Sequence, residues 1–343
     1  MKIAHVFYSL SYGGIETLMV NIANWQVENG HKVKVILINN TFENTLIDML
    51  DRRVEIIQLG RIPKTNAIVS ILKLNLYLLI HQVDILHIHA AEIGNVIQPF
   101  LKAQKVLHIH ATVGITHTVI PKHDKCIAIS ESVKRVLESQ YNTKSVVIYN
   151  GIDFHKFKKR KSNFIAEKMI CVGSLTTKIK NQDGLVSEFS CISNKIDADL
   201  YIVGDGPDYD MLQELINRLN LENRVFLVGN KSQMWIQNNL RNFDLFIQAS
   251  HTEGLGIAAI EAAASCIPLL LSKIDGHIEI SQNGDLCELF NPLIQGELGK
   301  GILEFYRDPE LYFEHAVKNH QIQESKFNFK LYNQKILNLY ASA

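Results

Sequence analysis

Two glutamates eight positions apart, Glu253 and Glu261, are the groups in this sequence whose types and spacing most clearly suggest chemistry. They bracket the stretch EGLGIAAIEAAA, in which a Gly-x-Gly turn (254–256) precedes a small-residue helix expected over 257–264. Glu253 comes just before this helix, where backbone N–H groups are unpaired, and Glu261 lies about two turns further on. Carboxylates and free N–H groups at one place suit a polyhydroxyl ligand that carries phosphate. The stretch is therefore predicted to be a binding site.

Histidine pairs form a second candidate group. DILHIHA (84–90) and KVLHIHATVG (105–114) are near-copies, and each ends a predicted strand with H-x-H. Because side chains alternate along a strand, both histidines of a pair lie on one face. Such a group could suggest zinc, but no cysteine or carboxylate stands at the spacing of a closed tetrahedral site, so no metal is predicted. The four histidines are His87, His89, His108 and His110, and a structural role is an equal alternative for His108 and His110.

Strand, glycine turn and helix recur along the chain, which is typical of doubly wound α/β domains. The first such unit is a strand over 3–7, the glycine pair Gly13-Gly14 and a helix over about 15–29. Its turn lacks the G-x-G-x-x-G fingerprint, so a dinucleotide is not favoured, whereas a diphosphate would suit the helix start. An ordinary turn between strand and helix is the alternative explanation of the glycine pair.

A second series of strands begins at 169–172 and ends at Gly173-Ser174, with Lys178 and Lys180 shortly after it. Further strands are expected over 200–203, 225–228, 245–247 and 267–271. A length of 343 residues also suggests two domains.

EGLGIAAIEAAA, followed by a strand and an S-x-x-x-G turn, resembles the donor-sugar motif of retaining GT-B glycosyltransferases of the family 4 type, also called glycosyl transferases group 1. The resemblance runs over nearly the whole chain. It implies an α/β fold of two Rossmann-like doubly wound domains facing across a cleft. Residues 1–153 would form the acceptor domain, completed by a C-terminal crossover helix at about 327–343. Residues 154–166 would be a solvated linker, and 167–326 the nucleotide-sugar-binding domain.

The resemblance also implies roles for single residues. Glu253 and the backbone of the following turn would hold the donor sugar, while Glu261 would bind the ribose. His110, with His108 as second choice, would contact the donor sugar from the first domain. The implied catalytic residues are His110, Lys180 and Glu253. The implied donor-binding residues are Gly13, Gly14, Gly173, Ser174, Lys180, Glu253, Gly254, Leu255, Gly256 and Glu261.

The chain departs from the family pattern at Ser174. The family usually has Gly-Arg there and a lysine several residues later, and these two cations meet the leaving diphosphate. Lys180, in the sequence KNQ, matches the family's lysine better than Lys178 does. The missing arginine keeps open a weakly catalytic homologue that binds nucleotide sugar and assists another transferase. A GT-B nucleotide-sugar epimerase is a further alternative, although no acid/base set for it is visible.

The predicted function is transfer of a sugar from a UDP- or GDP-sugar to a glycan or lipid-linked acceptor, with retention of anomeric configuration. Such an enzyme would serve the synthesis of cell-surface polysaccharide, capsule or lipopolysaccharide. No metal or other cofactor is expected. No nucleophile can be identified, which is consistent with a mechanism in which cations and N–H groups stabilise the departing diphosphate.

Composition limits the partners and the location. Lys+Arg and Asp+Glu both number 35, which argues against general nucleic-acid binding. Residues 1–165 hold 20 Lys+Arg against 12 Asp+Glu, so this half could face an anionic membrane surface or a phosphorylated acceptor, although chance partition explains it equally well. Five cysteines without C-x-x-C spacing, no leader and no membrane-spanning run predict a reduced, cytoplasmic protein. Peripheral attachment to the inner face of the membrane, through the apolar 67–80 segment, is a further expectation.

Overall fold

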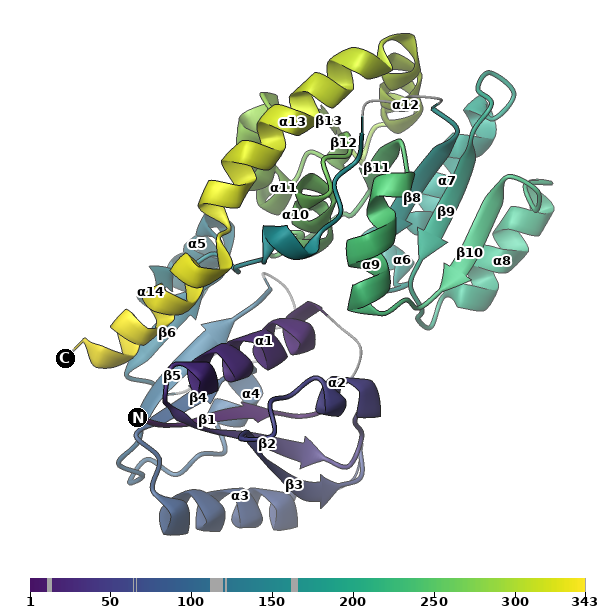
Figure 1. Cartoon of the computed structure of the whole chain (residues 1–343). Helices are drawn as coiled ribbons and strands as arrows, with labels where there is room; N and C mark the ends of the chain where they lie inside the picture. Colours follow the sequence, from purple (N-terminus) through teal and green to yellow (C-terminus); the bar gives the residue numbers. More distant parts are fainter. Residues whose placement is uncertain are drawn as a thin grey trace. The chain divides into compact units, whose positions relative to one another are not determined.

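The computed structural model describes residues 1–10, 14–63, 65, 67–111, 120, 122–161 and 166–342. The chain divides into two compact units. Unit 1 comprises Met1–Gly151 and Lys330–Ala343, and unit 2 comprises Ile152–Phe329. Each unit is a parallel sheet covered by helices (Figure 1), so the predicted class of two Rossmann-like α/β domains is confirmed.

The sheet of unit 1 has the strand order β3-β2-β1-β4-β5-β6-β7, and its described pairs are all parallel. The strand order reverses between β1 and β4. Ligands of such sheets usually bind at this point, at the carboxyl ends of the strands. The strands are β1 (Lys2–Phe7), β2 (Lys32–Asn39), β3 (Glu55–Arg61), β4 (Ile85–Ile88), β5 (Gln104–Ile109), β6 (Lys125–Ala128) and β7 (Val146–Val147). The helices are α1 (Gly14–Glu28), α2 (Asn44–Asp48), α3 (Ile68–His81), α4 (Ala91–Gly94), α5 (Glu131–Tyr141) and α14 (Phe329–Ala341).

Helices α1 and α14 cover the same face of the unit 1 sheet. Ile22 of α1 and Ile336 of α14 join one buried cluster with Ile3, Ile85 and Val106 from successive strands. Side chains alternate between the two faces of a strand. The residue two positions after each of these three therefore also points toward α1 and α14. Helix α3 lies on the opposite side of the sheet from α1 (Figure 1).

The sheet of unit 2 has the strand order β10-β9-β8-β11-β12-β13, again parallel in the described pairs. Its reversal lies between β8 and β11, which places the ends of these two strands at the expected ligand position. The strands are β8 (Lys168–Val172), β9 (Asp199–Val203), β10 (Val225–Gly229), β11 (Leu245–Gln248), β12 (Leu269–Ser272) and β13 (Glu288–Phe290). The helices are α6 (Thr177–Lys180), α7 (Gln182–Ile192), α8 (Tyr209–Arg218), α9 (Gln233–Asn239), α10 (Ile257–Ala264), α11 (Asp275–Ser281), α12 (Glu297–Arg307) and α13 (Pro309–Lys326).

The basic segment after Gly151 differs from the expected solvated linker in its described part, 152–161. Phe154 and Phe157 are buried. The Arg160 guanidinium is also buried and forms an ion pair with Asp244. Asp244 in turn accepts hydrogen bonds from the backbone N–H groups of residues 167 and 168. Within unit 2, Arg160 therefore fastens this segment to the beginnings of β8 and β11, because burial of its charge requires the carboxylate partner.

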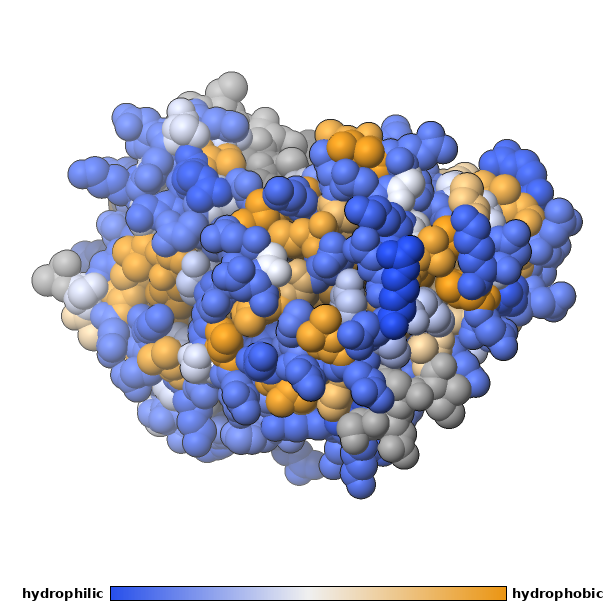
Figure 2. All heavy atoms as spheres, turned by 90° about the horizontal axis from the view of Figure 1, so that it is seen from above, coloured by the Kyte–Doolittle hydropathy of each residue, from blue (hydrophilic) through white to orange (hydrophobic). Residues whose placement is uncertain are grey.

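The surface is mixed in character. The face drawn in Figure 2 is mostly hydrophilic, with small apolar groups scattered among the charged residues. Among the described residues, no helix is both long enough and apolar enough to cross a membrane.

Candidate functional site

The stretch predicted as the binding site lies at the carboxyl ends of β11 and β12. Helix α10 begins at residue 257, as expected, directly after Gly256. Gly256 has a φ of +79°, which an L side chain would strain, and a Cβ there would come within 3.0 Å of the His277 ring. A Cβ on Gly276 would lie 2.9 Å from the carbonyl oxygen of Glu253. These two glycines allow the turn after β11 and the start of α11 to pack together.

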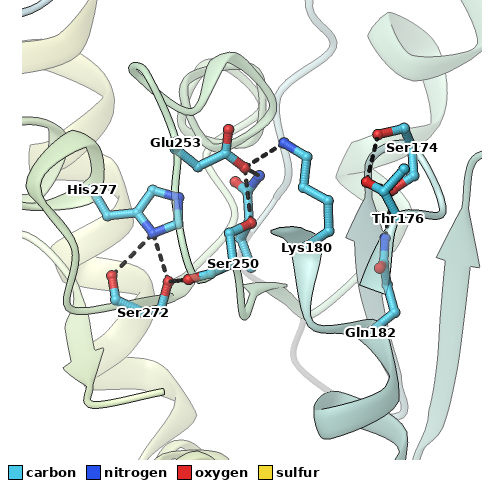
Figure 3. Close-up of polar contacts among 9 residues, drawn as sticks. Ser174, Thr176, Lys180, Gln182, Ser250, Glu253, Ser272 and His277 are labelled. Carbon is cyan, nitrogen blue, oxygen red and sulfur yellow. Dashed lines mark hydrogen bonds and ion pairs between the residues drawn. The ribbon is translucent and has the colours of Figure 1, made fainter. Parts of the chain in front are cut away.

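Three donors converge on one oxygen of Glu253 (Figure 3). Its Oε1 accepts hydrogen bonds from Lys180 Nζ at 2.5 Å, Gln248 Nε2 at 2.8 Å and Ser250 Oγ at 2.8 Å. Oε2 accepts no hydrogen bond from the described residues. The side chain of Glu253 is 10% exposed and that of Lys180 is 21% exposed. The carboxylate is thus held through one oxygen, while the other remains available to hydroxyl groups.

Lys180 reaches Glu253 because α6 is fastened to the segment after β11. The N–H of His251 donates to the carbonyl of Ile179 at 2.8 Å, and Asn181 Nδ2 donates to the carbonyl of Ala249 at 3.1 Å. The side chain of Lys180 passes close to Gly173. A Cβ added to Gly173 would lie 3.9 Å from Cδ and Cε of Lys180. The structure therefore brings together the predicted residues Gly173, Lys180 and Glu253.

Ser174 follows Gly173 in the turn at the end of β8. Its Oγ lies 3.3 Å from Thr176 Oγ1, and its carbonyl accepts a hydrogen bond from Gln182 Nε2 at 2.8 Å (Figure 3). Gly204 supports the turn from the neighbouring strand end, since a Cβ there would lie only 1.9 Å from the carbonyl oxygen of Gly173. Ser174 thus offers an exposed, neutral hydroxyl at the position where the family usually has a charge.

His277 is a site residue that sequence reasoning did not identify. It is fully buried, and its Nδ1 lies 3.0 Å from the carbonyl oxygen of Ser272. Since a carbonyl can only accept, Nδ1 carries the proton and Nε2 keeps a lone pair. Burial lowers the pKa of His277 to about 4, so the ring is neutral near pH 7. Nε2 finds no hydrogen-bond partner among the described residues. The S-x-x-x-G turn just before it was the one signal that pointed to this place.

Glu261 lies on α10 and is half-buried. Its Oε1 accepts a hydrogen bond from Gln233 Nε2 at 2.6 Å, a partner on α9 that the sequence did not suggest. Burial raises the pKa of Glu261 to about 7, and the hydrogen bond from Gln233 only partly opposes this effect. The carboxylate therefore changes charge near neutral pH.

The remaining predicted residues differ in the groups that they could offer to a ligand. Leu255 is buried, so it can offer a ligand only its backbone. Gly254 and Leu255 lie in the turn between Glu253 and α10. Gly14 is the first residue of α1, and Gly13 lies outside the described residues.

His110 and the other strand-end histidines lie in unit 1, together with His5 of β1. Their ligand nitrogens come within 4.8 Å in two groups of three, His5, His87 and His89, and His89, His108 and His110. The rings of His87 and His89 are stacked in parallel at 4.3 Å, with an interplanar angle of 2°. Nitrogens of the five rings are hydrogen-bonded in pairs, His5 to His89, His87 to His108 and His89 to His110. That the protein needs no metal stays a prediction.

The site in unit 2 therefore combines a lysine, a fixed carboxylate, a neutral buried imidazole and two glycine turns at one sheet edge. The lysine can meet phosphate oxygens, and the carboxylates and the imidazole lone pair can accept hydrogen bonds from hydroxyl groups. The chemistry fits a ligand with a diphosphate between two polyhydroxyl parts.

Two families match this chain. Residues 152–321 match the family described as Glycosyl transferases group 1, and residues 12–156 match Glycosyltransferase Family 4. N-acetyl-alpha-D-glucosaminyl L-malate synthase of Bacillus anthracis is 27% identical over 51% of this chain and 45% of its own length. An uncharacterized glycosyltransferase of Haemophilus influenzae is 22% identical over 92% of each chain. The chain thus spans less than half of the first relative and nearly all of the second.

The fold agrees with these matches. The Anabaena protein HepE, crystallised in complex with UDP and glucose, has a TM-score of 0.84 and is 21% identical over 100% of both chains. At this identity the likeness concerns the fold. Both parts of the chain match glycosyltransferase families, its two units are Rossmann-like and its fold is that of GT-B enzymes, so the chain belongs to the group 1 glycosyltransferases.

Proposed function

We propose that this glycosyltransferase moves a sugar from a UDP-sugar to a glycan or lipid-linked acceptor of a cell-surface polysaccharide, with retention of anomeric configuration. The observation that carries the proposal is the contact of Lys180 with Glu253 at the reversal point of the unit 2 sheet. It places a cation for the diphosphate beside a carboxylate for the sugar. The presence of UDP and glucose in the HepE structure supports a UDP-sugar over a GDP-sugar.

The work of the site is electrostatic in this proposal. As the bond to the sugar breaks, negative charge grows on the diphosphate, and Lys180 stabilises it together with backbone N–H groups at the strand-end turns. Glu253, fixed through Oε1 by Gln248 and Ser250, accepts hydrogen bonds from sugar hydroxyls at Oε2. Because Gln248 and Ser250 remain bound to Glu253, Lys180 can turn toward the phosphate without releasing the carboxylate. The lysine supplies positive charge from the protein itself, so we expect transfer without a divalent metal.

Glu261 binds the ribose in this proposal. A ribose presents two neighbouring hydroxyls, and an ionised carboxylate can accept a hydrogen bond from each. Gln233 holds one carboxylate oxygen at 2.6 Å and so orients the group. We also propose His110 as a catalytic residue, by its resemblance to the family's strand-end histidine.

A membrane-bound acceptor would explain the outer surface of α3. Large apolar side chains of this helix are 51 to 65% exposed, at residues Ile68, Val69, Leu72, Leu76, Leu79 and Ile80. At 100° per residue they cover an arc of about 120°, bordered by the exposed Lys73, while the buried Leu74 and Leu78 lie outside it. We call these six residues the α3 apolar surface.

The two chain segments next to the α3 apolar surface are basic in sequence, and Glu55 of β3, which contacts Tyr77 of α3, is paired with Lys34. Asn75 hydrogen-bonds to the backbone of residues 96 and 98, which ties the turn bearing Phe100 and Lys102 to α3. Phe100 is 65% exposed. Residues 61–82 and 96–105 contain lysines and an arginine but no aspartate or glutamate. An apolar stripe with basic borders suits the surface of an anionic bilayer. We therefore propose peripheral attachment to the inner, cytoplasmic face of the membrane.

A donor assay tests the proposed activity. The protein is incubated with UDP-glucose, UDP-N-acetylglucosamine and GDP-mannose, each with a membrane lipid extract as acceptor, and free nucleotide is measured. Proton NMR of the product gives its anomeric configuration. Release of UDP that depends on acceptor, with an α-linked product from an α-linked donor, is the expected result. An inverted product would exclude retention, and conversion of one nucleotide sugar into another would indicate an epimerase. Binding without release under every acceptor condition would favour the weakly catalytic homologue.

A further inference from the structure

Five histidines form a continuous polar layer inside unit 1. They are His5, His87, His89, His108 and His110, and they come from the strands β1, β4 and β5 or the residues directly after them. Each follows the alternation that directs Ile3, Ile85 and Val106 toward α1 and α14. Two residues of those helices complete the layer, Gln26 of α1 and Tyr340 of α14.

All five imidazoles are neutral near pH 7. Burial lowers the pKa of His5 to about 4 and that of His110 to about 3, and it lowers the pKa of the other three as well. A neutral imidazole has one N–H donor and one lone-pair acceptor. Once one nitrogen of a ring is known to donate, the other must accept. A hydrogen-bonded row of such rings therefore has a single direction, which is set at one end.

The first row, which we call the His5 row, runs from Gln26 to His110. Gln26 Oε1 lies 2.9 Å from His5 Nε2, and because a carbonyl oxygen can only accept, His5 donates from Nε2. His5 Nδ1 must then accept from His89 Nε2 at 3.0 Å. His89 Nδ1 accepts in turn from His110 Nε2 at 3.2 Å. The row ends at His110 Nδ1, a buried lone pair with no partner among the described residues.

The second row, which we call the Tyr340 row, starts from the other end of the same amide. Gln26 Nε2 donates to the Tyr340 hydroxyl at 3.5 Å, and this hydroxyl contacts His87 Nδ1. Burial raises the pKa of Tyr340, so the phenol keeps its proton and can donate it to His87. His87 then donates from Nε2 to His108 Nδ1 at 3.1 Å. This row ends at His108 Nε2, an N–H that is buried without a partner among the described residues.

We propose that the amide of Gln26 sets the direction of both rows and thereby leaves His110, a predicted catalytic residue, with an unprotonated Nδ1 that can accept a hydrogen bond but cannot donate one. Gln26 is a positioning residue, since it acts on His110 only through His5 and His89. The proposal concerns unit 1 alone and goes beyond the proposed function.

The two rows have opposite directions because the two ends of one amide have opposite hydrogen-bonding character. Protons point toward Gln26 along the His5 row and away from it along the Tyr340 row. All five rings consequently carry their proton on Nε2. Turning the amide over would reverse both rows and put all five protons on Nδ1, which would convert His110 from an acceptor into a donor.

Histidine tautomers are measured directly by long-range ¹H–¹⁵N NMR of the ¹⁵N-labelled protein, with the five rings assigned by replacing each in turn. The wild-type protein should show Nε2–H for all five. Nδ1–H signals for His5, His89 and His110 would overturn the proposed direction. This measurement uses the protein without nucleotide sugar, so it does not depend on the proposed function.

Gln26→Glu tests the control by Gln26, because an ionised carboxylate accepts at both ends. At about pH 9, where this carboxylate is ionised, Tyr340 should donate to it instead of to His87. His87 and His108 should then change to Nδ1–H, while His5, His89 and His110 stay Nε2–H. Adding Tyr340→Phe removes the phenol through which the carboxylate acts on His87. In the double variant His87 and His108 should therefore no longer be held in the Nδ1–H tautomer. Five unchanged tautomers in Gln26→Glu at this pH, or a change in all five, would contradict the proposal.

Discussion

Lys180 and Glu253 form an ion pair in which Nζ lies 2.5 Å from Oε1, although 73 positions separate them in the sequence. The same oxygen also accepts from Gln248 and Ser250. Lys180 could therefore leave while Gln248 and Ser250 hold the carboxylate in place. This arrangement lets one carboxylate serve as the resting partner of the lysine and as part of a sugar site.

Removal of the Lys180 charge should abolish most of the turnover. No arginine stands at position 174, so in the proposed mechanism Lys180 alone supplies the charge that the family usually shares between two cations. Loss of one preorganised stabilising group typically lowers turnover by about 100- to 1000-fold, and we expect at least this for Lys180→Ala, with a smaller effect on donor affinity. Steady-state kinetics with saturating donor measures the change. The matched control is Lys178→Ala, an exposed lysine of the same helix, which should stay near wild type. Turnover of Lys180→Ala within about threefold of wild type would remove the assignment.

Nucleotide binding should depend on pH through Glu261. Burial raises the pKa of this carboxyl to about 7, so it is protonated below neutral pH and ionised above it. In the proposed site the ionised carboxylate accepts hydrogen bonds from the ribose hydroxyls, so the affinity for UDP-glucose should fall up to about tenfold between pH 8 and pH 6. Isothermal titration calorimetry at several pH values measures this. Glu261→Gln should flatten the profile, and Glu261→Ala should weaken binding by about 1.5–3 kcal/mol at pH 8. A flat profile in the wild-type protein would argue that Glu261 is structural.

The raised pKa of Glu261 also affects the free energy of unfolding, which should fall as pH rises, whereas nucleotide affinity should rise. The folded state holds the Glu261 proton more tightly than the unfolded chain, whose pKa stays near 4.5. The stabilisation is complete below about pH 4.5 and is lost as pH rises through about 7. Compared with wild type, Glu261→Gln should therefore gain relative stability between these values, which urea unfolding at several pH values would detect.

Gly204→Ala should destabilise unit 2 and displace the Gly173 turn. A Cβ at Gly204 would lie 1.9 Å from the Gly173 carbonyl oxygen, and backbone atoms cannot move aside cheaply. We expect a loss of about 2–4 kcal/mol in the free energy of unfolding, measured by urea denaturation. Gly229→Ala is the control, since Gly229 also has a positive φ, of +72°, but nothing lies within 4 Å of its added Cβ. Equal losses in the two variants would mean that backbone strain alone, without the contact to Gly173, decides the effect.

Membrane attachment should depend on both the α3 apolar surface and charge. Co-sedimentation with phosphatidylglycerol vesicles should fall as salt rises, because salt screens the attraction of the basic border. Replacing Leu72 and Leu76 by serine should weaken binding, whereas Leu293→Ser should not, although Leu293 is 82% exposed in unit 2. Equal binding to neutral and anionic vesicles, or binding to neither, would exclude the proposal.

Transfer should continue after removal of divalent metals. The proposed site meets the diphosphate with Lys180 and backbone N–H groups, so EDTA should leave turnover within about twofold of its value without chelator. Added Mg²⁺ or Mn²⁺ should not raise it further. A loss of activity with EDTA that Mg²⁺ restores would show that a metal shares the phosphate site.

Much of the fold could be predicted because its signals are local. The apolar run before Gln248, the glycine turn and the small-residue run determined a strand, a turn and a helix, and α10 spans the predicted 257–264. Strand spacing and turn chemistry act within a few residues, so they do not depend on the rest of the chain. The H-x-H spacing similarly put His87 and His89 on one face, and the structure shows their rings stacked.

The sequence alone therefore determined the two α/β units and the position of the candidate site, while only the tertiary structure decided which groups face each other. It brought Gln248, Ser250 and Lys180 to one oxygen of Glu253, and it joined Gln26 to Tyr340, 314 positions away. It also placed His277 against Gly256 and buried Glu261 enough to raise its pKa to about 7. The physical reason is that hydrogen-bond partners and desolvation depend on which strands become neighbours. Neighbours are chosen by sheet order and by packing over the whole chain, and a single sequence does not display them.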